Sequence, residues 1–276
     1  MSPLLFAGTI VAASLNTVAV AQATSPAPGS SASRAGRFMD NCRSRDQDEG
    51  ERFCETRDVA MPATSNLRVN GQDNGSITVH GWDKSTIQVV AMIQANAESE
   101  SDARDLARRV TVSTSDGELS ADGPSTRRRE WWSVSFEIWA PSHTALELRA
   151  RNGGIAVNDV ESRMDLETVN GGLSVADVGG DVRGTTVNGD VTAELSGSKW
   201  SGTGLDLQTS NGGVHLLLPE NYSARLETGT VNGGMNIGFP ITVQGSFGRR
   251  LSTQLGEGGP TIRAMTTNGG ITIRRR

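Results

Sequence analysis

The stretch "LETVNGGLSVADVGGDVRGTTVNGDVTAEL", residues 166–195, contains one unit twice. The pattern Thr-x-Asn-Gly begins at Thr168 and returns at Thr186, 18 residues later. In both copies, small or apolar residues alternate with polar ones before the asparagine and again after the glycines. Alternation with a period of two is typical of a strand that buries one face. Each unit therefore predicts a strand, a tight corner and a second strand.

The unit recurs through the C-terminal half of the chain. It is marked by Asn152, Asn170, Asn188, Asn211, Asn232 and Asn268, each followed by glycine. The first intervals are 18, 18, 23 and 21 residues, and the last is 36, which equals two periods or one coil with an insertion. Asn74, followed by Gly75, Ile77 and Val79, looks like an earlier copy of the second half. Fixed periods of this length indicate a repeat architecture.

We therefore predict an all-β, parallel β-solenoid, resembling a β-helix, with Asn-Gly-Gly corners. The asparagines and the threonines before them share the parity of the buried residues, so we expect both to stack near the inward face. Stacked amides can bond to each other and to the turn backbone. The alternative is a meander of hairpins with Asn-Gly turns. The threonine two residues before the asparagine in five of the six copies favours the solenoid.

The residues before the repeat predict a cap. Residues 67–93 and 132–138 alternate as strands, while residues 98–110 place apolar side chains at helical spacing. We expect an N-terminal β cap that contains one short helix and protects the end of the solenoid from edge pairing. Residues 59–276 are then a single domain.

The first residues indicate export. Residues 1–23 contain an apolar run and the cleavage signal Ala21-Gln22-Ala23, as in a signal peptide. Residues 24–58 are expected to be a flexible linker and a charged segment that carries Cys42 and Cys54. In an exported chain two cysteines most simply form one disulfide, rather than a metal or redox pair. After cleavage no segment is apolar enough for a membrane span, so we expect a periplasmic or secreted protein.

Composition and motifs argue against several functions. The net charge of −5 and the pI near 5.3 disfavour nucleic acid as a partner. His80, His143 and His215 stand alone in the sequence, and no catalytic or cofactor-binding motif is present. We therefore predict no catalytic residue, no metal site and no cofactor.

One segment is a candidate ligand patch. Arg127, Arg128 and Arg129 precede Trp131 and Trp132. Guanidinium groups suit carboxylate and phosphate partners, and exposed indole rings stack on sugars. The alternative is that the arginines lie in a solvated loop and the tryptophans pack in the core or the cap.

The chain resembles the bacterial putative-adhesin family over residues 59–276. The resemblance rests on "NGSITVHGWD" (74–83), "VSFEIWAPSHTALELRARNGGI" (134–155), the Thr-x-Asn-Gly-Gly repeats and "LGEGGPTIRAMTTNGGITI" (255–273), in that order. It implies a right-handed parallel β-solenoid at the cell envelope, with no catalytic residues to carry over.

These observations lead to a prediction of function with two alternatives. We expect an exported, non-enzymatic, adhesin-like β-solenoid with a structural or binding role, whose partner is an envelope glycan or an envelope protein. The first alternative is a carbohydrate-active β-helix enzyme, for which Glu167, Asp206 and Glu227 form a possible outward stripe of carboxylates. The second, a flat ice-binding or filament-forming face, is disfavoured because the threonine row is expected to point inward.

Overall fold

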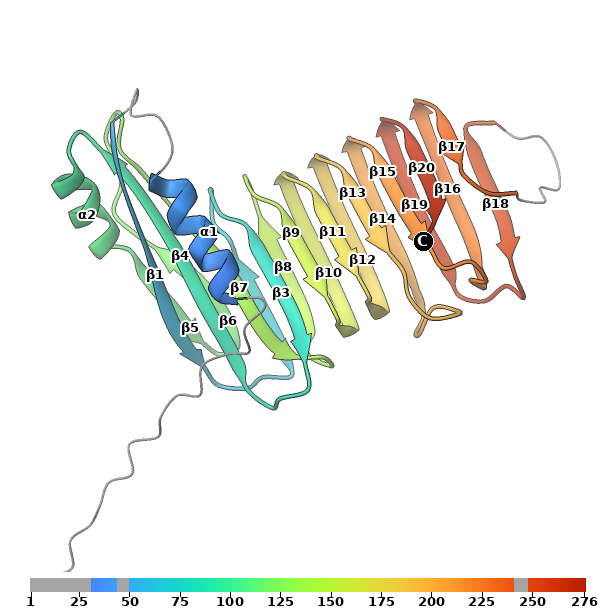
Figure 1. Cartoon of the computed structure of the whole chain (residues 1–276), viewed down its shortest axis with the longest axis horizontal. Helices are drawn as coiled ribbons and strands as arrows, with labels where there is room; N and C mark the ends of the chain where they lie inside the picture. The colour runs from blue at the N-terminus through green and yellow to red at the C-terminus, as the bar shows by residue number, and fades with distance from the viewer. Residues whose placement is uncertain (1–30, 44–49, 241–247) are drawn as a thin grey trace, which may run out of the picture.

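A computed structural model of the 276-residue chain describes residues 31–43, 50–240 and 248–276. The predicted signal peptide, residues 1–23, and the first part of the predicted linker, residues 24–30, lie outside the described residues. The described chain forms two ten-stranded sheets, which lie one over the other along the long axis of the molecule (Figure 1). One apolar core contains residues from both sheets.

The strand order shows how the chain winds. Sheet A contains, in spatial order, β1 (Glu51–Met61), β4 (Ile87–Ala97), β7 (Trp131–Pro141), β3 (Ile77–Trp82), β9 (Ile155–Asn158), β11 (Leu173–Ala176), β13 (Val191–Glu194), β15 (Val214–Leu218), β20 (Ile271–Arg275) and β17 (Met235–Ile237). Sheet B contains β18 (Arg250–Leu255), β16 (Ala224–Asn232), β19 (Thr261–Asn268), β14 (Gly204–Asn211), β12 (Gly179–Asn188), β10 (Glu161–Asn170), β8 (Ala145–Ala150), β2 (Asn66–Asn70), β6 (Glu118–Asp122) and β5 (Thr111–Ser115).

Most neighbouring strands in both sheets run parallel. In the described ranges antiparallel pairs occur only near the ends of the sheets: β1 with β4, β4 with β7, β5 with β6, and β16 with β18. A hairpin meander would have antiparallel neighbours throughout. The all-β, solenoid-like prediction is therefore confirmed, and the meander is wrong.

Each coil places one strand in each sheet. In the coil that begins at Glu161, β10 ends at Asn170 in sheet B, and β11 begins at Leu173 in sheet A. Equivalent residues of successive coils pair in register, such as Thr168 with Thr186. One coil alone buries little, so stacking of equivalent apolar residues is what creates the core.

The coils do not stack in chain order at the C-terminal end. β19 lies between β14 and β16, and β20 lies between β15 and β17. The last coil thus inserts between the two coils that precede it in the sequence. The chain therefore ends inside the row of strands rather than at its end (Figure 1). The interval of 36 residues before Asn268 is therefore one coil with an insertion, which includes the antiparallel strand β18.

The threonines of the repeat join each coil to its neighbour. Thr186 Oγ1 donates to Gly171 O at 2.8 Å, across two stacked corners. The same bond is made by Thr168 to Gly153, Thr209 to Gly189, Thr266 to Gly212 and Thr230 to Gly269, at 2.8–2.9 Å. All five hydroxyls belong to buried side chains. They satisfy corner carbonyls that lie outside the strand ladders.

The asparagines form a ladder of their own at the same corner. Each amide nitrogen donates to the amide oxygen of the next asparagine, at 2.7–3.1 Å, in the order Asn232, Asn268, Asn211, Asn188, Asn170, Asn152 and Asn74. Unlike the threonines, the asparagines of the six predicted corners are exposed, so the expectation that they lie near the inward face is wrong. The alternation of burial ends at the threonine, because both residues that follow it, such as Val169 and Asn170, are exposed although β10 runs to Asn170.

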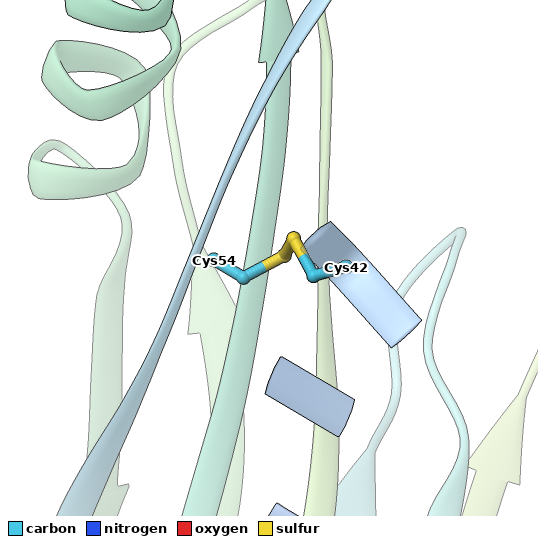
Figure 2. Close-up of a disulfide and its surroundings, with 2 residues drawn as sticks. All are labelled: Cys42 and Cys54. Atoms are coloured by element: carbon cyan, nitrogen blue, oxygen red, sulfur yellow. A yellow bond between two sulfur atoms is a disulfide. The ribbon is translucent and has the colours of Figure 1, made fainter. Parts of the chain in front are cut away.

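The N-terminal end is capped by antiparallel strands and two helices. α2 (Glu100–Arg108) is the predicted helix and buries Ala103, Leu106 and Ala107. α1 (Ser31–Arg43) lies against β1 and β4 (Figure 1). A disulfide joins Cys42 near the end of α1 to Cys54 in β1, with Cα atoms 6.3 Å apart (Figure 2).

The predicted linker, residues 24–58, differs from the structure. Part of it is helix α1, and β1 pairs with β4 from Glu51 to Met61. Sheet A therefore begins before residue 59, the predicted start of the domain. The charged residues of β1 hid its alternation, because the face that carries Phe53, Val59 and Met61 toward the core also carries Glu55 and Arg57.

The threonine bonds predict a stability difference between two adjacent residues. Thr186→Val leaves the Gly171 carbonyl without its partner, and we expect a loss of about 1–2 kcal/mol of unfolding free energy. Thr185, the neighbouring residue, points to the opposite face of the sheet. Thr185→Val is the control, with an expected change within about 0.5 kcal/mol. Chemical denaturation measures both, and equal effects would show that the hydroxyl bond is unimportant.

Candidate functional site

The outer face of sheet B is occupied by ion pairs between neighbouring coils. Arg149 contacts Glu147 at 3.4 Å and Asp165 at 3.5 Å, and it also pairs with Glu167. These side chains are partly exposed, so each pair contributes little to stability. Their effect is to match part of the charge on this face within the sheet.

The carboxylates of the enzyme alternative belong to this face. Glu167 pairs with Arg149, Asp206 with Arg263 at 3.1 Å, and Glu227 with Arg225 at 3.0 Å. Each carboxylate of the predicted stripe is thus an ion-pair partner on the outer face of a sheet. The arrangement gives the enzyme alternative no support.

On the outer face of sheet A, one row of side chains carries no carboxylate, lysine or arginine from β3 to β17; on β7 the same row continues with Glu137, which is buried. Its members pair in register across seven strands: Thr78, Ala156, Ser174, Thr192, His215, Thr272 and Asn236. We call these residues the neutral row. Apart from Thr78, which is buried, they are half-buried or exposed.

A second row widens this surface over β9 and β11. Asn158 and Ala176 pair there, and both are uncharged and half-buried. The next residue of the second row is Glu194, whose carboxylate lies 3.2 Å from Arg276 Nε. The uncharged area is therefore widest over β9 and β11 and narrows from β13 onward.

Aromatic rings border the N-terminal end of the neutral row. The imidazole of His80 stacks on Trp139, with ring centroids 5.3 Å apart and an interplanar angle of 21°. Asn158 Nδ2 lies 3.4 Å from His80 Nδ1, and Glu137 Oε1 lies 3.3 Å from His80 Nε2. If the amide donates to Nδ1, the ring proton is on Nε2 and points at the carboxylate. These contacts fix the plane of the imidazole.

Helix α1 limits the surface on this side. Phe38 of α1 packs with Val90, Met92 and Trp139 in a second, small apolar cluster, together with Trp82. Trp82 is half-buried, and the Lys84 ammonium lies 4.5 Å from the centre of its ring. The uncovered part of the face therefore begins beside His80 and Trp82.

The predicted ligand patch is divided between two faces of β7. Trp132 packs against the main core and donates Nε1 to Pro124 O at 3.0 Å. Trp131 is half-buried on the other face, 5.8 Å from the Arg52 guanidinium. Arg127, Arg128 and Arg129 are exposed in the loop before β7. The two indole rings do not form one stacking surface, because consecutive strand residues point in opposite directions.

The other histidine positions show no cluster of ligands. His143 Nδ1 lies 3.1 Å from Glu161 O, and His215 is a member of the neutral row. Across residues 31–43, 50–240 and 248–276, no three His, Cys, Asp or Glu side chains come together as a metal site. None of the helices in the described ranges has the length and apolar character needed to cross a membrane.

A family assignment follows from comparison with known proteins. The model of the Toastrack DUF4097 family matches residues 59–274. The chain belongs to this family. No curated protein matches it.

Solved structures similar to this Toastrack chain share little sequence with it. A putative cell adhesion protein from Clostridium sporogenes ATCC 15579 has 12% identity and a TM-score of 0.43, covering 82% of this chain and 100% of its own. A putative adhesin from Bacteroides fragilis NCTC 9343 has 12% identity and a TM-score of 0.41, covering 81% and 97%. A putative lipid binding protein from Parabacteroides distasonis ATCC 8503 has 12% identity and a TM-score of 0.29, covering 80% and 96%.

The Toastrack chain also has a groove at the corner opposite the asparagine ladder. The groove has a volume of about 900 Å³ and lies between the loops that follow β13, β15, β17 and β18. Tyr222 lines it but is only 5% exposed. Burial raises the pKa of the Tyr222 phenol from 10.0 to about 12.

This pKa predicts an alkaline transition. The folded chain favours the neutral phenol, so its contribution to stability is complete below pH 10 and is lost as the pH rises through about 12. Tyr222 is the single tyrosine of the sequence, so phenolate absorbance reports it alone. We expect a midpoint near 12 for folded protein and about 10 in denaturant. A midpoint near 10 before unfolding would contradict the buried position.

Proposed function

We propose that the chain is an exported, non-enzymatic, adhesin-like β-solenoid of right-handed winding, which binds a neutral glycan chain at the bacterial envelope. The binding surface is the neutral row with Asn158 and Ala176. The observation that carries the proposal is the contrast between the two outer faces. On sheet B one outward row is charged at every strand from β2 to β16, and several of its members form ion pairs, whereas sheet A presents an uncharged row from β3 to β17.

The chemistry of the neutral row suits a polymer of hydroxyl groups. Ser174, Thr192 and Thr272 each offer a donor and an acceptor, repeated at the strand spacing of about 4.8 Å. Small residues such as Ala156 and Ala176 leave the sheet flat, so an extended chain could approach the backbone closely. Without a net charge, the row has no electrostatic attraction for polyanions.

The border of the surface adds an aromatic contact. His80 and Trp82 are half-buried beside the neutral row. Trp139 covers one face of the imidazole and the Lys84 ammonium lies over the Trp82 ring. The remaining exposed part of these aromatic residues is available to a ligand, and an aromatic ring packs well on the apolar face of a sugar. This end would set the position of the first sugar along the row.

The disulfide supports export. Cys42 and Cys54 are joined, and disulfides persist mainly in oxidising compartments such as the periplasm and the extracellular space. The predicted signal peptide of residues 1–23 agrees with that location. The periplasm and the cell exterior both fit an envelope ligand.

A pair of threonines tests the binding face. The purified protein is titrated with neutral glycans from the bacterial envelope. Thr192→Arg places a long cation in the neutral row, and we expect binding to weaken at least about tenfold. Thr185→Arg, the matched control, adds the same charge to the outer face of sheet B and should leave binding unchanged. Because the surface is neutral, the affinity of the unmodified chain should vary little with salt.

A further variant separates this surface from the patch in the loop before β7. Trp131→Ala should bind like the unmodified chain. Binding that is lost in Trp131→Ala, kept in Thr192→Arg and weakened by salt would move the site to Arg127, Arg128 and Arg129 and identify an anionic ligand. No binding to any neutral glycan would also contradict the proposal.

A further inference from the structure

The asparagine ladder is built from the most reactive dipeptide of the protein backbone. In an Asn-Gly pair, the glycine nitrogen can attack the asparagine Cγ, with loss of its proton. A nitrogen–carbon bond forms, the Cγ–Nδ2 bond breaks, and ammonia leaves a cyclic succinimide. Water then opens the ring to aspartate or isoaspartate. The reaction requires a glycine nitrogen without a hydrogen-bond acceptor and an amide that can rotate toward it.

The internal corners oppose both requirements. Gly171 N donates to Asn188 O at 2.9 Å, and Gly189 N donates to Asn211 O at 3.0 Å. Gly212 and Gly269 make the same bond to the next coil. The asparagine before each of these glycines also uses both amide atoms in the ladder, as Asn188 does toward Asn170 and Asn211. Ring closure at an internal corner must break these bonds together.

Asn232 lacks these restraints because its coil is the last in the stack. Its Nδ2 donates to Asn268, but among the described residues its Oδ1 accepts no ladder bond. Gly233 N likewise has no backbone acceptor in the described ranges. Asn232 and Gly233 are both exposed, so water reaches the reacting atoms.

The two other corners without a glycine N–H bond are restrained in different ways. Asn152 uses both amide atoms, toward Asn74 and Asn170. Asn74 has one free amide atom in the ladder, but Gly75 is buried, so water has less access to its nitrogen than to that of the exposed Gly233. Neither corner combines an amide that is bonded on one side only with an exposed glycine, as Asn232 and Gly233 do.

We propose that Asn232–Gly233 is a self-modification site, where the folded chain deamidates while the internal corners stay intact. The terminal coil can accept the product. An isoaspartate adds one carbon to the backbone, and here no further coil has to match it. The new carboxylate lies next to Val231, whose carbonyl already accepts from Arg249 Nη1 at 2.9 Å. The modification thus adds one negative charge beside a fixed arginine at the C-terminal end of the ladder.

The test is a comparison of corners within one chain. The full folded protein is incubated in mildly alkaline buffer, digested, and the aspartate and isoaspartate at each Asn-Gly pair are quantified by mass spectrometry. We expect Asn232 to convert about tenfold or more faster than Asn188 and Asn211, because internal corners must break additional hydrogen bonds. In denaturant the three sites should react at similar rates.

Two variants assign the new charge. Asn232→Gln should abolish the acidic species that accumulates on ion exchange, whereas Asn188→Gln should leave it. The comparison in the unmodified chain needs neither variant to fold. Equal rates at Asn232, Asn188 and Asn211 in the folded protein, or faster conversion at Asn74 or Asn152, would overturn the proposal.

Discussion

The bond from a buried threonine hydroxyl to a glycine carbonyl of the neighbouring corner is the contact on which the stacking of coils depends. A strand ladder alone tolerates a slip of register, although a slip of one residue would turn every buried side chain outward. The corner prevents this, because Thr186 reaches Gly171 only when Thr168 and Thr186 are paired. The same contact leaves no room for a side chain at the corner: a Cβ at Gly171 would lie 2.2 Å from Gly153 O.

Once the register is fixed, identical positions of successive coils form rows, and a row can keep one chemical character over many strands. Buried rows supply the core. On sheet B one outward row consists of acids and arginines, some of which form ion pairs. On sheet A the outward row remains small and uncharged, which is why a neutral polymer is the partner that we propose. The function proposed here therefore follows from repetition of a face rather than from a pocket or a catalytic group.

The sequence predicted the coils well because period-two alternation and Thr-x-Asn-Gly are local signals. It also pointed to the disulfide and to helix α2. It could not predict that the last coil lies between two earlier ones, since Asn211 and Asn232 look equally good neighbours for Asn268. It missed α1, whose residues Ser31–Arg43 have the composition of a linker, and β1, whose charges hide its alternation. Strand parity alone would have predicted that Trp131 and Trp132 lie on opposite faces. The neutral row could be found only from the full strand pairing of sheet A.

Amide hydrogen exchange at the corner glycines measures most directly whether the corners hold the coils in register. Gly171, Gly189, Gly212 and Gly269 lie at an outer corner of the solenoid, yet each N–H donates to the next coil. We predict that these amides exchange as slowly as those of the central strands, because they open only when coils separate. Gly197, exposed in the loop after β13, should exchange quickly and serves as the reference. Fast exchange at all five glycines would show that the corners do not hold the coils in register.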